Sequence, residues 1–167
     1  MKPSVKSGVK PDENTCQSAT TTVNAATGTP LVNPTCGGCI EMFIPGEPVP
    51  KGSMRQVARG VMVHDNPKLR RWSQTIQLVA KQAYQGAPID VPVHVEAVFY
   101  LPKPKRTRFT VPAVKPDCDK LQRALGDGLE NSGVLANDSR IVAWSTQKRY
   151  ADAANPEGAH VKIKAVG

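Results

Sequence analysis

The first 39 residues contain almost none of the large apolar side chains from which a protein core is built. Leu31 is the only Leu, Ile, Phe, Trp or Tyr among them, and Ser, Thr, Asn, Ala, Pro and Gly predominate. A segment of this composition buries too little apolar surface to offset the entropy lost on ordering. We therefore expect residues 1–39 to form a disordered arm and residues 40–167 to form one folded domain.

The expected domain carries most of the positive charge. The chain has 22 Lys and Arg against 14 Asp and Glu, a formal net charge of +8. Residues 40–167 hold 19 of the basic and 12 of the acidic residues, so +7 belongs to the domain. This balance favours a polyanionic partner, although solubility alone also explains it.

The chain shows neither a membrane span nor a secretory signal. No stretch approaches the ~18–20 apolar residues of a spanning helix, and the lysine-containing N-terminus lacks an apolar core. We expect a cytoplasmic, reducing location without membrane attachment.

Two cysteines, Cys36 and Cys39, have the spacing of a metal-binding pair. No second pair of Cys or His at short spacing completes a zinc site. A redox-active pair normally opens a helix, whereas residues 40–44 have the pattern of a strand. We favour a flexible glycine-containing joint, with a zinc module as the alternative.

Alternating apolar residues predict strands, and helical spacing predicts two helices. Strand 93–101 is apolar on both faces, which favours a central, largely buried position. Lysines on one face of the last strand suit a sheet edge. The first helix starts at the Asn66 cap and ends at Gly86, and the second covers 117–129 with Asp117 at its N-cap. The other predicted strands are 40–44, 140–150 and 159–166, with a short hairpin at 56–58 and 61–63. The predicted fold class is α+β, a single small domain with a mixed β-sheet of about four to five strands and two main helices.

The second helix carries a charged stripe beside an apolar one. Leucines recur every fourth residue from Leu121 to Leu129 and mark the buried face. Asp119, Arg123 and Asp127 recur at the same interval on a neighbouring face. Solvated ion pairs between successive turns would explain the charged stripe by itself.

A further acidic residue, Asp138, lies at the start of strand 140–150. If this strand pairs beside the helix start, Asp138 converges with Asp117 and Asp119. Clustered carboxylates repel one another and need a cation, and oxygen ligands select Mg²⁺, with Mn²⁺ as a possible substitute. On a basic domain such a cluster predicts phosphodiester hydrolysis, with Arg123 stabilising the charge of the transition state.

These motifs form one extended pattern. It consists of Lys115-Pro116-Asp117-Cys118-Asp119, a basic residue at 123, Asp127, and Asp138 before a strand. Over about residues 40–166 the pattern resembles the RusA family of crossover-junction (Holliday junction) endodeoxyribonucleases. The resemblance implies a homodimer that resolves four-way DNA junctions by paired nicks in recombination and repair, with Mg²⁺ and no small-molecule cofactor.

The resemblance also implies roles for single residues. Asp117, Asp119 and Asp138 would bind the metal, and Arg123 stands where the family usually has a lysine. Asn137 replaces the first member of the family's usual acidic pair, which puts a metal role for position 137 in doubt.

Basic residues around the acidic pattern are the predicted DNA contacts. Arg106 and Arg108 lie in a loop ahead of it, and we expect this loop to contact DNA phosphates. The alternative is that the loop is only solvated and contacts no DNA. The full predicted set is Lys51, Arg55, Lys103, Lys105, Arg106, Arg108, Lys115, Lys120 and Lys148.

Two other function classes stay open. A non-catalytic DNA junction-binding module would share the basic surface, but carboxylates on a DNA-facing surface reduce affinity unless they are needed. An aspartyl-phosphate phosphatase would place its acidic pair at the end of an apolar strand, whereas here Pro116 and a basic loop precede it.

Overall fold

The computed structural model describes residues 39–52, 55–58, 61–63 and 66–166. The expected arm, residues 1–39, lies outside this description apart from Cys39, and so does Cys36. The strands are β1 (Cys39–Pro45), β2 (Arg55–Ala58), β3 (Val61–Val63), β4 (Val93–Leu101), β5 (Ile141–Tyr150) and β6 (Gly158–Ala165). The helices are α1 (Pro67–Ala83) and α2 (Cys118–Asn131), with a 3₁₀ turn, η1 (Asp138–Arg140).

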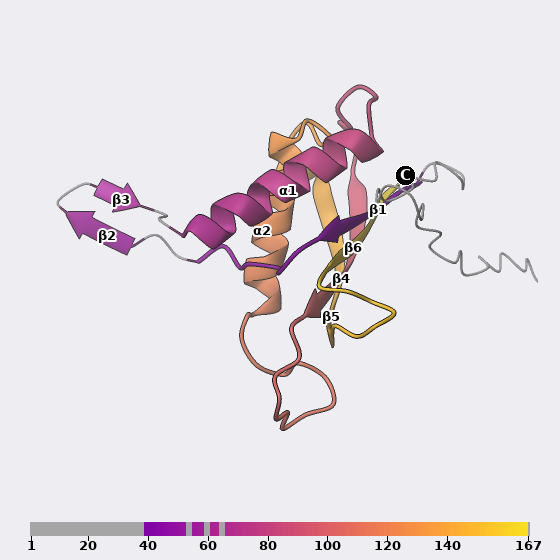
Figure 1. Ribbon diagram of the computed structural model, residues 1–167. Coiled ribbons are helices and arrows are strands. Elements are labelled where there is room, and N and C mark those ends of the chain that lie inside the picture. The colour runs from indigo at the N-terminus through magenta and orange to yellow at the C-terminus, as the bar shows by residue number, and fades with distance from the viewer. Residues whose placement is uncertain (1–38, 53–54, 59–60, 64–65, 167) are drawn as a thin grey trace, which may run out of the picture. The chain divides into compact units, whose positions relative to one another are not determined.

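Four strands form a mixed sheet in the order β1-β6-β4-β5. β6 pairs antiparallel with both β1 and β4, whereas β5 pairs parallel with β4. A parallel pair needs a long crossover, and α2 lies in the segment that joins β4 to β5. β2 and β3 form the predicted hairpin. The structure confirms the α+β fold, with two helices on a mixed sheet (Figure 1).

The helices pack on one face of the sheet and build the core there. Ile76 from α1 and Leu125 and Leu129 from α2 are fully buried together with Val95 and Phe99 from β4. Each such side chain contributes roughly 1.5–3 kcal/mol on burial. The leucine stripe predicted for α2 therefore faces the core.

Gly128 allows the two helices to approach closely. A β-carbon at this position would lie 2.5 Å from Cγ2 and 2.9 Å from Cβ of Ile76. Since Ile76 is fully buried and branched at that carbon, it has little freedom to move away. The glycine thus sets the packing distance between α1 and α2.

The first helix begins as predicted and ends earlier than predicted. The Asn66 side chain accepts a hydrogen bond from the Lys68 N–H at 3.1 Å, which confirms it as the N-cap. The helix ends at Ala83, not at Gly86, because Tyr84 adopts an extended backbone conformation. No helix in the described part of the chain is long and apolar enough to cross a membrane.

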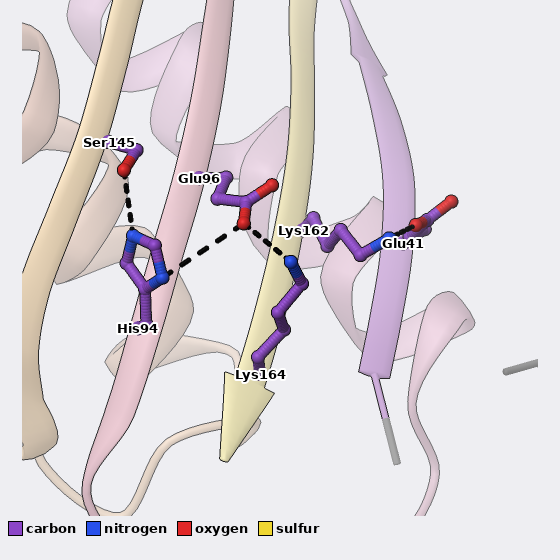
Figure 2. Close-up of polar contacts among 6 residues, drawn as sticks. All are labelled: Glu41, His94, Glu96, Ser145, Lys162 and Lys164. Carbon is purple, nitrogen blue, oxygen red and sulfur yellow. Dashed lines mark hydrogen bonds and ion pairs between the residues drawn. The ribbon is translucent and has the colours of Figure 1, made fainter. Parts of the chain in front are cut away.

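The opposite face of the sheet is lined mainly by charged and polar side chains, and one prediction about it is wrong. We call it the open face and define it by Glu41, Phe43, His94, Glu96, Ser145, His160, Lys162 and Lys164. β4 is central and largely buried, as predicted, although His94 and Glu96 alternate with buried residues and are partly exposed on the open face. β6 was predicted at an edge but lies inside the sheet, since it pairs with β1 on one side and β4 on the other. Its lysines pair with glutamates of β1 and β4 across the open face (Figure 2).

Candidate active site

Two of the predicted acidic residues lie at the start of α2. Asp117 occupies the N-cap position, but its side chain makes no capping hydrogen bond. Instead, the Asp117 carboxylate forms an ion pair with Lys120 Nζ at 3.2 Å. Asp119 lies in the first turn and is exposed. The two carboxylates therefore meet different surroundings although they are two residues apart.

The third predicted acidic residue, Asp138, opens η1 directly before β5. It lies close against α2 beside Gly126, where a β-carbon would be 4.0 Å from the Asp138 Cβ. Gly126 follows Asp119 by seven residues, or two helical turns, so both lie on the same side of the helix. The absence of a side chain at Gly126 leaves the space between the two acidic residues open.

Asp119, Arg123 and Asp138 line one hollow of about 190 Å³. We call it the α2 hollow; its other lining residues are Gln122, Gly126, Ile141 and Trp144. Gln122 Nε2 donates a hydrogen bond to Thr146 Oγ1 at 2.7 Å, which ties α2 to β5 beside the hollow. This arrangement brings together charged residues that are up to 19 positions apart in the sequence.

The charged groups of the α2 hollow are not neutralised within the described part of the chain. Among those residues, the side chains of Asp119, Arg123 and Asp138 form no ion pair. The alternative interpretation of the helix stripe as ion pairs is not met among these residues: Asp127 pairs with Lys51, and Arg123 pairs with neither aspartate. The hollow therefore presents two carboxylates and a guanidinium to a ligand.

The structure does not form the three-carboxylate cluster that the sequence predicts. Asp117 is not among the lining residues of the α2 hollow, and its carboxylate is held by Lys120. No group of three His, Cys, Asp or Glu residues suited to a metal ion occurs among the described residues. Two of the three predicted metal ligands are thus brought together, and the third is directed to a lysine.

Two carboxylates still suit a Mg²⁺ ion. Proteins commonly bind Mg²⁺ through one or two carboxylates, while waters and substrate phosphates complete the octahedral shell. Asp119 and Asp138 supply oxygen donors, and the α2 hollow has room for several waters at about 30 Å³ each. The donor set therefore fits Mg²⁺ or Mn²⁺.

Lys148, one of the predicted DNA contacts, holds the loop that leads into α2. Its Nζ donates hydrogen bonds to the carbonyl oxygens of Val114 at 2.7 Å and Pro116 at 2.8 Å. These bonds occupy two of the three donors of the ammonium group. Lys148 therefore fixes the path of the chain immediately before Asp117.

Two other predicted DNA contacts also have partners within the chain. Lys51 forms an ion pair with Asp127, and its N–H donates to the Lys120 carbonyl at 3.0 Å. Lys120 pairs with Asp117. The side chain of Arg55 lies outside the described side chains.

The remaining predicted contacts are exposed in the loop between β4 and α2. The Arg108 guanidinium lies 5.2 Å from the centre of the Phe109 ring, a cation–π contact. Phe109 is itself 42% exposed. The exposed basic residues are Lys103, Lys105, Arg106, Arg108 and Lys115.

The sequence did not identify four of the residues that line the α2 hollow, Gln122, Gly126, Ile141 and Trp144. Gln122 follows Asp119 by three residues, and that spacing on a helix could have placed both on one face. Trp144 packs against the core and also lines the hollow. Its position depends on where β5 lies beside α2, which the local sequence does not specify.

A separate polar network crosses the open face of the sheet (Figure 2). Ser145 Oγ lies 2.8 Å from His94 Nε2, and His94 Nδ1 lies 4.0 Å from Glu96 Oε1. The second separation exceeds a hydrogen bond. Lys164 Nζ donates to Glu96 at 2.6 Å, and this hydrogen bond holds the pKa of Glu96 below its ordinary value. The network is therefore a series of cross-strand pairs that stabilises the sheet, and His94 has a hydrogen-bond partner within it.

Comparison with known proteins places these features in a family. A family model described as "Endodeoxyribonuclease RusA" matches residues 45–164. The chain is 26% identical over 125 residues to "Crossover junction endodeoxyribonuclease RusA" of Aquifex aeolicus (strain VF5), covering 75% of this chain and 90% of that protein. It is 30% identical over 128 residues to "Uncharacterized protein YqaN" of Bacillus subtilis (strain 168), covering 68% of this chain and 89% of that protein. The chain belongs to the RusA endodeoxyribonuclease family.

Proposed function

We propose that this protein is a Mg²⁺-dependent, structure-selective endodeoxyribonuclease that resolves four-way DNA junctions by paired symmetric nicks, acting in recombination and repair. The observation that carries this proposal is the α2 hollow, in which Asp119, Asp138 and Arg123 meet without neutralising partners among the described residues. Membership of the RusA family and the named activity of the Aquifex relative support the same reaction.

The proposed reaction assigns a chemical role to each charged residue of the hollow. Asp119 and Asp138 bind the divalent ion, which when bound polarises a phosphoryl oxygen and lowers the pKa of a water. Arg123 contacts the non-bridging oxygens of the phosphate and stabilises the charge that develops there. Ile141 and Trp144 form an apolar side of the hollow beside these charged groups.

Asp117 has a place in this proposal as a third ligand. Its carboxylate is 48% exposed and is neutralised by Lys120, which is itself 41% exposed. Exposed ion pairs are worth only about 0–1 kcal/mol. A divalent ion in the hollow can therefore replace Lys120 as the cation bound to Asp117 at small cost.

The basic loop between β4 and α2 supplies the proposed DNA contacts. Its exposed side chains include Lys103, Lys105, Arg106 and Arg108. Contacts of lysine and arginine with DNA phosphates increase affinity and position the protein on the DNA, but they do not recognise the base sequence. Two opposed strands are cut most simply by two protomers related by a two-fold axis, so we propose that the active form is a homodimer.

A synthetic four-way junction tests the proposed function. The expected result is Mg²⁺-dependent nicking of two opposed strands at symmetric positions. Asp119→Asn should abolish nicking while binding of the junction is retained, because only the metal ligand is lost. Glu157→Gln, a matched loss of an exposed carboxylate outside the hollow, should nick like the wild type. Junction binding by the wild type without nicking would instead support the non-catalytic module.

A further inference from the structure

The turn that carries Asp138 is held by the side chain of its neighbour, Asn137. Asn137 Oδ1 accepts a hydrogen bond from the Ser139 N–H at 3.0 Å. Asn137 Nδ2 donates to Glu130 Oε1 at 3.0 Å. One amide group thereby joins the cap of η1 to the last turn of α2, and we call this pair of bonds the amide bridge.

The amide bridge completes a set of anchors around Asp138. Upstream, the Ala136 N–H donates to the Ile89 carbonyl at 3.0 Å. Downstream, Arg140 Nε donates to the Asp90 carboxylate at 2.6 Å. η1 is only three residues long, so its own hydrogen bonds fix little of its orientation. The amide bridge is the anchor that connects this turn to α2, the helix that carries Asp119.

We infer that Asn137 is a positioning residue that holds the proposed metal ligand Asp138 opposite Asp119. This inference rests on the proposed function, because it concerns the same metal site. The bridge needs an amide side chain at position 137, because its oxygen accepts a hydrogen bond from the Ser139 N–H and its nitrogen donates one to Glu130. An aspartate would still accept from Ser139 but would place a second carboxylate against Glu130.

A role of residue 137 as a direct metal ligand and a role through the amide bridge predict opposite effects of Asn137→Asp on metal affinity. If residue 137 were itself a ligand, Asn137→Asp would add a negative oxygen donor and bind the divalent ion more tightly. If residue 137 acts through the amide bridge, the same substitution repels Glu130 and weakens metal binding. Glu130 therefore distinguishes the two roles, because it takes part in only one of them.

The experiment compares Asn137→Asp, Glu130→Gln and the double variant with the wild type. Affinity for Mn²⁺ is measured without DNA by calorimetry, and the Mg²⁺ concentration for half-maximal nicking is measured alongside it. Loss of a residue that orients a ligand typically costs 10–100-fold in metal affinity. We expect Asn137→Asp to weaken Mn²⁺ binding by about tenfold.

The double variant reverses the donor and the acceptor of the bridge, because the glutamine amide can donate to the new aspartate. We expect it to recover most of the lost affinity. Glu130→Gln alone should stay near the wild type, because the glutamine side-chain oxygen can still accept the hydrogen bond from Asn137 Nδ2. Asn131→Asp adds the same charge to the adjacent residue of α2 without breaking the bridge, and should change little. Tighter Mn²⁺ binding by Asn137→Asp, or no recovery in the double variant, would overturn the inference.

Failure of the proposed function gives a different result. In that case the wild type binds no Mn²⁺ and nicks no junction under any condition. The amide bridge is then tested by measuring the hydrogen-exchange rate of the Ser139 backbone N–H. If the bridge holds the turn, this rate should be at least about tenfold faster in Asn137→Ala than in the wild type. An unchanged exchange rate would show that Asn137 positions nothing.

Discussion

The α2 hollow and the open face of the sheet both carry acidic side chains, and they differ in how these are neutralised. On the open face, Glu41 pairs with Lys162 and Glu96 pairs with Lys164 (Figure 2). In the α2 hollow, Asp119 and Asp138 form no ion pair among the described residues, although Arg123 lines the same hollow. Acidic groups that the fold pairs with lysines stabilise the sheet, whereas those that it leaves unpaired are available to a cation from solution.

The largest expected effect follows from removing one carboxylate from each surface. Asp138→Asn should reduce nicking by about a thousandfold, equal to several kcal/mol of lost transition-state stabilisation. Glu41→Gln should leave the nicking rate within about twofold, since Glu41 lies on the open face. Single-turnover nicking of a labelled junction measures both rates. Equal losses in the two variants would remove the distinction between the surfaces.

Two glycines of α2 differ in the same way: Gly128 packs against the core, whereas Gly126 lines the α2 hollow. Gly128→Ala should destabilise the fold by about 1–3 kcal/mol, because the new methyl group would lie 2.5 Å from Cγ2 of Ile76. Gly126→Ala should keep or raise stability, because its nearest contacts would be 3.7 Å from Ile141 and Trp144 and alanine favours the helix. It should nevertheless slow nicking, since its methyl group enters the α2 hollow. Urea unfolding and nicking assays separate these outcomes.

The elements and the core were largely predictable because they depend on local patterns. The leucine spacing in α2 identified its buried face, and the Asn66-Pro67 signal identified the start of α1. Alternation identified the strands. Asp119 and Asp138, which the sequence pattern predicts together, line the same hollow, and their metal role stays a prediction.

The order of the strands and the partners of the charged residues were not predictable in this way. The lysines of β6 indicated an edge, yet β6 pairs on both sides, and its lysines have glutamate partners on β1 and β4. Asp117 pairs with Lys120 instead of joining the α2 hollow, and Lys148 binds loop carbonyls. A long basic side chain reaches many groups, and only the tertiary structure decides among them.

A smaller effect is expected from pH on the open face. Burial lowers the pKa of His160, which packs between Phe43 and Tyr100 with ring-centre distances of 4.8 and 5.7 Å, although Glu41 opposes the shift. The neutral form is favoured in the folded state, so stability is full above the ordinary pKa of about 6.5 and falls as the pH decreases below it. His160→Gln should reduce this loss of Tm between pH 7.5 and 5.5. An identical pH profile in that variant would exclude His160 as its cause.

The smallest expected effect concerns DNA binding by the exposed loop. Arg106→Ala should weaken junction binding uniformly across sequences and lower the slope of log affinity against log salt by about one. Lys162→Ala, on the open face, should leave that slope unchanged. Fluorescence anisotropy at several salt concentrations gives both slopes. If the two variants behave alike, the loop has no special part in binding.

The most direct test of the central claim is a crystal structure with Mn²⁺ soaked in, examined by anomalous scattering. The proposed site predicts a peak within the α2 hollow, with oxygens of Asp119 and Asp138 at about 2.0–2.2 Å. Asp117 should then be released from Lys120 and turned toward the ion. A crystal that shows Mn²⁺ bound elsewhere on the domain, with the α2 hollow holding none at saturating concentration, would contradict the account.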